Sequence, residues 1–117
     1  MSNDVRVDLV YDLTCPNVEE ARAAIRTALT AVGLPPIWQE WLRVDPDTPA
    51  ALRQLGSPSV LVNGRDVGGD EGHLAHADAH SCRLYVDESG CLAGAPTVQL
   101  ILDVINRRDE EHRVHPA

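Results

Sequence analysis

The sequence predicts an α/β fold in which helices cover both faces of a small sheet. Segments with the two-residue period of a strand alternate with segments that have the three-to-four-residue period of a helix. An Asn-Gly pair, typical of a tight hairpin, separates two strand-like segments in the middle of the chain. An apolar helical pattern follows near the C-terminus. We therefore expect a βαβ half joined to a ββα half.

The first half is predicted to be strand, helix and strand. Apolar residues alternate with other residues over 5–11, as in a strand with one buried face. From Pro16 onward the apolar residues fall three or four apart, on one face of a helix. They are Val18, Ala21, Ile25, Ala28, Leu29 and Val32. Pro16 suits the first helical turn, because its missing N–H would have no helical partner there. Gly33 ends the helix, and residues 37–44 are predicted as a second strand.

The second half is predicted to be richer in short elements. In chain order these are a helix over 49–55, strands over 59–62, 65–67 and 82–86, and a helix over 97–107. The pair Asn63-Gly64 should close a hairpin between the first two of these strands. No internal repeat or linker divides the chain. One domain is therefore expected over residues 1–108, followed by a polar tail over 109–117.

The composition excludes several classes of function. The chain has 117 residues, 44% of them hydrophobic, which is enough for one modest core. Its net charge of −8 argues against nucleic acid and anionic membrane surfaces, since both require clustered Lys and Arg. No 18-residue apolar run and no signal-peptide pattern is present, so a cytoplasmic location is expected. In that reducing compartment the three cysteines should be thiols or ligands rather than disulfides.

Cys15 stands where the first predicted strand passes into the first predicted helix. The N–H groups at the start of a helix lack helical partners, and the aligned peptide dipoles leave partial positive charge there. A thiolate is stabilised by that charge, so Cys15 is expected to be a reactive thiol. Glu19 and Glu20, one turn into the helix, oppose this effect. A cysteine that only packs in the interior fits the same position equally well.

The stretch Cys15-Pro16-Asn17-Val18 between strand and helix, together with Ser57-Pro58 before a hairpin strand, resembles thioredoxin-like proteins. The similarity in element order covers residues 5–107. It implies that Cys15 is the reactive thiol, that Pro58 is a cis proline beside it, and that Ser57 offers backbone contacts to a substrate. Val18 stands where many members carry a second cysteine, so the motif is monothiol. The chain is more weakly similar to small thioredoxin-like proteins related to organomercurial lyases.

A monothiol needs a partner from elsewhere, and the chain offers Cys82 and Cys91. A second thiol, from one of them or from glutathione, could attack a mixed disulfide and complete an exchange cycle. Two of the three thiolates could instead hold a soft ion such as mercury(II), copper(I) or zinc. Cys82 is preferred, because the loop before it could bring it near the first helix. Both cysteines could equally be packing residues.

Two further features remain open. His73, His76 and His80 would share one face if their segment were helical, and imidazoles suit a borderline metal such as zinc. A polar loop with solvated histidines is the favoured alternative. The last helix is apolar on nearly all sides, which two-sided burial or a homodimer contact would explain.

The leading hypothesis is a thiol-based redox or soft-metal-handling protein that uses Cys15 as nucleophile or primary ligand. Cys82 would be the resolving thiol or second ligand, and Pro58 would shape the site. As an enzyme it would be a monothiol thiol–disulfide oxidoreductase. It would need no cofactor beyond a thiophilic metal ion or glutathione. The alternative is a non-catalytic binding or interaction module that kept the fold without the dithiol motif.

Overall fold

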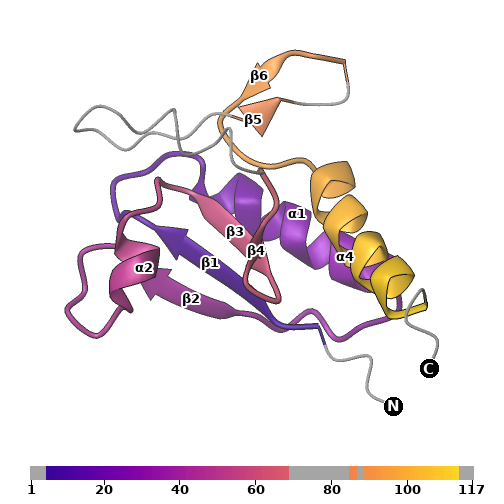
Figure 1. Cartoon of the computed structure of the whole chain (residues 1–117). Helices are drawn as coiled ribbons and strands as arrows, with labels where there is room; N and C mark the ends of the chain where they lie inside the picture. Colours follow the sequence, from indigo (N-terminus) through magenta and orange to yellow (C-terminus); the bar gives the residue numbers. More distant parts are fainter. Residues whose placement is uncertain (1–4, 69–84, 87–88, 114–117) are drawn as a thin grey trace.

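A four-stranded mixed sheet forms the centre of the molecule (Figure 1). The computed structural model describes residues 5–68, 85–86 and 89–113. In chain order the strands of this sheet are β1 (Val7–Tyr11), β2 (Gln39–Leu42), β3 (Ser59–Val62) and β4 (Arg65–Asp66). Across the sheet they lie in the order β2-β1-β3-β4. β1 pairs parallel with β2 and antiparallel with β3, which pairs antiparallel with β4.

Helices cover both faces of this sheet. On one face α1 (Val18–Ala31) and α4 (Val98–Arg113) lie side by side and begin at the same end of the molecule (Figure 1). The short helix α2 (Ala50–Arg53) lies on the other face. A separate hairpin of β5 (Tyr85–Val86) and β6 (Leu92–Ala93) lies at the end where α1 and α4 begin. In the described part of the chain, no helix is long and apolar enough to cross a membrane.

The two faces of β1 supply two hydrophobic clusters, because successive side chains of a strand point in opposite directions. Val7 and Leu9 belong to the larger cluster with α1, β3 and α4. Val10 packs on the opposite face with Leu55 and Leu61. Val7, Leu9 and Val10 are at most 1% exposed, since both faces of the central strand are covered. The two clusters therefore lie on opposite faces of the sheet, with β1 between them.

The predicted α/β class and small mixed sheet are confirmed, whereas several element boundaries are wrong. The first helix begins at Val18 rather than Pro16, because a turn closed by the Cys15 N–H and the Asp12 carbonyl precedes it. The last helix continues to Arg113. Residues 109–113, predicted as part of a polar tail, are helical because charged residues such as Arg and Glu sustain a helix without an apolar period.

Other differences concern the strands and the apolar last helix. β1, β2 and β4 are shorter than predicted, β3 has the predicted bounds, and β6 was not predicted. A two-residue strand such as β6 has no detectable period, so only its pairing with β5 defines it. The apolar side chains of α4, from Val98 to Ile105, all belong to the larger cluster or pack against it. Burial within the chain therefore accounts for them, and the predicted homodimer contact stays a prediction.

Candidate functional site

Cys15 lies in the loop that joins the end of β1 to α1. Its side chain is partly exposed and packs against the larger hydrophobic cluster. The next two residues, Pro16 and Asn17, separate it from the first residue of α1. The helix charge therefore acts on the thiol from a greater distance than the sequence predicted, and it weakens quickly beyond the first turn. Glu19 and Glu20 occupy that first turn, as predicted.

Val18, in the position of the missing second cysteine, is a core residue. Its side chain is 6% exposed and belongs to the cluster between the sheet and the two long helices. Asn17 precedes it as the N-cap residue, but the Asn17 side chain makes no capping hydrogen bond. The start of α1 is therefore anchored by apolar packing at Val18 and not by a side-chain cap.

The Ser57–Pro58 turn is the second part of the site. The peptide bond between these residues is cis, and both are buried. The Ser57 hydroxyl accepts a hydrogen bond from the Asp12 N–H at 2.9 Å. On the other side, the buried Tyr85 hydroxyl donates to the Pro58 carbonyl. The turn is thus held both by the end of β1 and by β5.

Asp12 connects the cysteine loop to this turn. Its N–H donates to Ser57, while its carbonyl oxygen accepts from the Cys15 N–H at 3.1 Å. Its carboxylate accepts from Arg43 Nε, at 3.0 Å to one oxygen and 3.2 Å to the other. Arg43 is anchored in turn, because its N–H donates to the Tyr11 carbonyl at 2.8 Å. Three separate segments therefore meet at one residue.

Asp12 and Arg43 were not among the predicted site residues. Each directly follows a strand, and the parallel register of β1 and β2 aligns Tyr11 with Leu42. The carboxyl ends of adjacent parallel strands meet at one sheet edge, so opposite charges just beyond them become neighbours. The available signal was a charged residue at the end of each of two predicted strands, Asp12 just after the first and Arg43 near the end of the second. It could not be used without knowing that these strands are adjacent and parallel.

The other predicted thiols and ligands are placed less completely. Cys91 is exposed, directly precedes β6, and like Cys15 is not disulfide-bonded. Three residues further along the chain, Gly94 lies against the side chain of Asn17, so this segment meets the cysteine loop. The remaining predicted site residues, Cys82, His73, His76 and His80, lie outside the described residues. Among the residues that are described, no group of three or more His, Cys, Asp or Glu is arranged to hold a metal ion.

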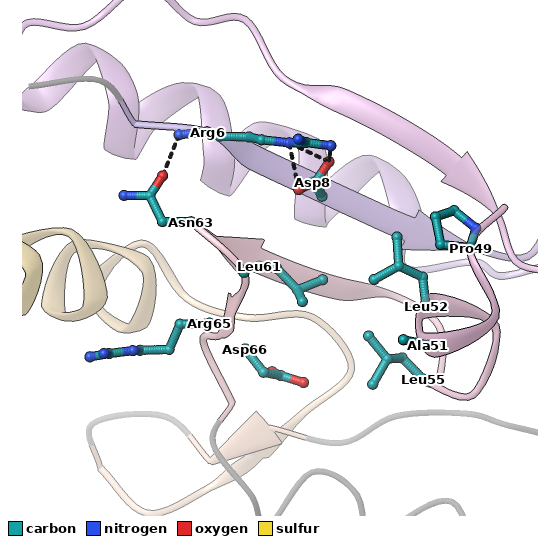
Figure 2. A pocket seen from close by; sticks show the side chains of 11 residues that line it. Arg6, Asp8, Pro49, Ala51, Leu52, Leu55, Leu61, Asn63, Arg65 and Asp66 are labelled. Atoms are coloured by element: carbon teal, nitrogen blue, oxygen red, sulfur yellow. Dashed lines mark hydrogen bonds and ion pairs between the residues drawn. The ribbon is translucent and has the colours of Figure 1, made fainter. Parts of the chain in front are cut away.

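A concavity, which no sequence motif indicated, lies on the α2 face of the sheet. This pocket of about 720 Å³ is bordered by α2, β1 and the β3–β4 hairpin, as Figure 2 shows. Leu52, Leu55 and Leu61 give it an apolar wall. Its charged residues are Arg6, Asp8, Arg65 and Asp66. Since two arginines and two aspartates offset each other, formal charge favours neither an anion nor a cation in it.

Comparisons with protein-family models, with curated proteins and with solved structures find no match for this chain. The chemistry must therefore follow from the residues themselves. The Cys15 loop carries a thiol nucleophile, whereas no cysteine lines the pocket on the α2 face. Its connection through Asp12 to the Ser57–Pro58 turn makes it the candidate functional site.

Proposed function

We propose that the chain is a thioredoxin-like protein whose Cys15 thiol takes part in thiol–disulfide exchange. The strand order β2-β1-β3-β4, with one parallel and two antiparallel pairs, supports this fold. The cis peptide bond before Pro58, at the start of β3, is also expected of it. One observation carries the function: Asp12 ties the Cys15 turn directly to the Ser57–Pro58 turn through two backbone hydrogen bonds.

The proposed exchange has two steps. The Cys15 thiolate attacks one sulfur of a substrate disulfide, which forms a mixed disulfide and releases the other sulfur as a thiolate. A second thiol, deprotonated to its thiolate, then attacks the mixed disulfide. The attack is on the Cys15 sulfur, so a new disulfide forms between Cys15 and the second thiol, and the substrate sulfur leaves as a thiolate. The substrate disulfide is reduced by two electrons, while two thiols are oxidised to a disulfide. Because Val18 occupies the motif position, the second thiol comes from glutathione, Cys82 or Cys91.

Soft-metal handling would use the same thiol as a ligand, with a second thiolate from Cys82 or Cys91.

The non-catalytic alternative has its own support in two exposed apolar side chains near the site. Leu13 is 77% exposed and Val44 is 70% exposed, and they follow the carboxyl ends of the adjacent strands β1 and β2. Exposed apolar groups of this kind are common at protein interaction surfaces.

The first test is the alkylation rate of Cys15 in the intact chain, followed against pH by peptide-resolved mass spectrometry. Cys91 provides an internal reference, because it is exposed in the same molecule. We expect Cys15 to react at least about threefold faster than Cys91 at neutral pH, because exchange at Cys15 requires a thiol that is more reactive than an ordinary exposed one. A rate no higher than that of Cys91 or of a free model thiol would contradict the exchange function.

A second measurement separates redox from metal chemistry. Wild-type protein and Cys15→Ser are each incubated with glutathione disulfide and, separately, titrated with mercury(II) or zinc. Exchange predicts a mixed disulfide at Cys15 that is absent from the variant. Equal metal affinity in both proteins would remove Cys15 as a ligand. A protein that forms no mixed disulfide and binds neither metal would favour the interaction module.

A further inference from the structure

We infer that the pocket on the α2 face of the sheet binds a small hydrophobic amine. The ammonium group of this ligand binds the Asp66 carboxylate, and its apolar body contacts the leucine wall. The inference goes beyond the proposed function, because Cys15 packs against the larger cluster and does not line this pocket. Three features support it: the register of the strands, the charge on this face, and the apolar wall.

Strand register places two carboxylates on the α2 face. Asp8 lies opposite Leu61 where β1 pairs with β3, and Leu61 lies opposite Asp66 where β3 pairs with β4. Side chains directly opposite one another in antiparallel strands share a face. Leu61 belongs to the smaller cluster on the α2 face, so Asp8 and Asp66 flank it there. Arg65 instead lies opposite Val62 of the larger cluster, and Figure 2 shows its side chain directed away from the leucines.

The charge on this face is negative, although the formal charges around the pocket border balance. The Asp8 side chain is 9% exposed and forms an ion pair with Arg6 Nε at 3.2 Å. It also accepts a hydrogen bond from Trp41 Nε1 at 3.0 Å. Arg6 therefore offsets Asp8, and Asp66 leaves one negative charge in excess. The net charge of −8 on the whole chain acts in the same direction, attracting cations and repelling anions.

The Asp66 carboxylate is held in place for this role. One of its oxygens accepts the Gly68 N–H at 2.8 Å. A carboxylate offers about four lone-pair positions on its two oxygens, so the same group can also accept a hydrogen bond from an ammonium ion. Such charge-assisted bonds are stronger than those between neutral groups.

The leucine wall determines the rest of the ligand. Leu55 and Leu61 are 6% and 8% exposed, and the partly buried Leu52 packs against them. The pocket volume of about 720 Å³ lies within the range of about 300–1,000 Å³ that is typical of small-molecule sites. A bare metal ion would leave these leucines uncovered. A cation with an alkyl or aromatic body would bury them, which is favourable.

The test titrates the isotope-labelled full chain with phenylethylamine at pH 7, where an aliphatic amine is protonated. The two indole N–H signals of the NMR spectrum report the site. The Trp41 N–H binds Asp8 and should shift to saturation, whereas the Trp38 N–H binds Glu40 and should stay unchanged. We expect a Kd on the order of 1 mM, because so small a ligand buries little surface. Equal shifts of both signals, or none, would overturn the inference.

Two further ligands test the charge. Phenylethanol has the same apolar body without a charge, and phenylpropionate carries a negative charge. The amine should bind at least about fivefold more tightly than the alcohol, and the anion should bind most weakly. An alcohol that binds as tightly as the amine, or an anion that binds more tightly, would contradict the proposed ligand class.

Variants of the full chain assign the two ends of the ligand. Asp66→Asn keeps an acceptor for the Gly68 N–H and should weaken amine binding about 5- to 20-fold, the effect of one charge about 4–5 Å away. Its affinity for the alcohol should not change. Leu52→Ala should weaken the binding of both ligands alike. Asp103→Asn is the matched control, because it removes an exposed carboxylate from α4, and it should change amine affinity by less than about twofold. Equal losses in the two Asp→Asn variants would overturn the inference.

Arg6→Gln keeps the inference testable if Asp66→Asn does not fold. This variant removes the positive charge beside Asp8 and should strengthen amine binding about two- to fivefold. Weaker binding would contradict the assignment. Cys15→Ser should bind the amine like the wild type, so the two proposals fail separately. An unreactive Cys15 contradicts thiol exchange alone, and a pocket that does not select the amine contradicts this inference alone.

Discussion

At the scale of single residues, Gly94 and Asn17 define how closely the segment after β6 approaches the cysteine loop. A Cβ atom at position 94 would lie 2.7 Å from Asn17 Cγ and 2.9 Å from Asn17 Oδ1. Both distances are shorter than side chains tolerate, so a side chain at position 94 would require the amide end of Asn17 to rotate away. Asn17 makes no capping hydrogen bond, and its side chain is instead occupied by this contact.

Gly94→Ala should therefore destabilise the protein by about 0.5–1.5 kcal/mol, because the added methyl group forces Asn17 out of its present rotamer. Urea unfolding measures the effect. In the background of Asn17→Ala, which removes the obstructing atoms, the same substitution should cost less than about 0.5 kcal/mol. An equal cost in both backgrounds would show that the added methyl group meets something other than Asn17.

At the scale of elements, a network of charged and aromatic side chains joins α1 to β2. Arg22 of α1 donates to both carboxylate oxygens of Glu40, at 2.8 and 3.0 Å. Trp38 Nε1 donates to the same carboxylate at 2.9 Å, and the Arg22 guanidinium lies over the Tyr11 ring. The hydrogen bond from Arg22, with a smaller contribution from Trp38, holds the pKa of Glu40 below its ordinary value of 4.5.

This depressed pKa makes part of the stability pH-dependent. The unfolded chain binds a proton at Glu40 more readily than the folded chain, so the stabilisation is complete above about pH 4.5 and is lost as pH falls through the lower folded-state pKa. Glu40→Gln should reduce the free energy of unfolding by about 1–3 kcal/mol at pH 7. It should also flatten the fall in stability between pH 5 and about pH 3.

Glu19→Gln is the control for this prediction. Glu19 also contacts Arg22, but its side chain is 83% exposed, so the change should cost less than about 0.5 kcal/mol. Guanidinium unfolding at several pH values measures both variants. A Glu40→Gln protein with the wild-type acid dependence would contradict the assignment.

At the scale of the whole molecule, the larger hydrophobic cluster joins the two ends of the chain. Ile25 of α1 and Ile101 of α4 are both fully buried in it, together with Leu9 of β1. Trp38 packs against this cluster, and Trp41 packs against the smaller one on the other face. The fluorescence of Trp38 therefore reports on the packing of one sheet face, and that of Trp41 reports on the other.

Ile101→Ala should destabilise the molecule by about 2–5 kcal/mol, because it leaves a cavity in the larger cluster. Since that cluster connects α4 to the sheet, tryptophan fluorescence and helical circular dichroism should give the same lowered unfolding midpoint. Leu13→Ala, at a position 77% exposed, should change stability by less than about 0.5 kcal/mol. A fluorescence midpoint unchanged in Ile101→Ala would mean that α4 unfolds independently of the sheet.

Local signals predicted the elements more successfully than their ends. The Asn63-Gly64 pair predicted its hairpin correctly, because the backbone has positive φ at both residues, a conformation that Asn and Gly adopt readily. The start of α1 was predicted two residues early, since Pro16 is compatible with a first turn that the chain does not form. The position of the Cys15 thiol before α1 followed from the sequence. Its connection to Ser57 through Asp12 could not be predicted, because it depends on a contact between residues distant in the chain.

The sequence by itself determined the α/β class, the order of the main elements and the place of Cys15 between β1 and α1. These follow from local periodicity and turn residues, which act over a few positions. Only the tertiary structure decided that Asp12 joins Cys15 to the Ser57–Pro58 turn and that Arg43 neutralises Asp12. The physical reason is that both contacts depend on strand pairing. Register places particular side chains together across large sequence separations, and no local pattern encodes it.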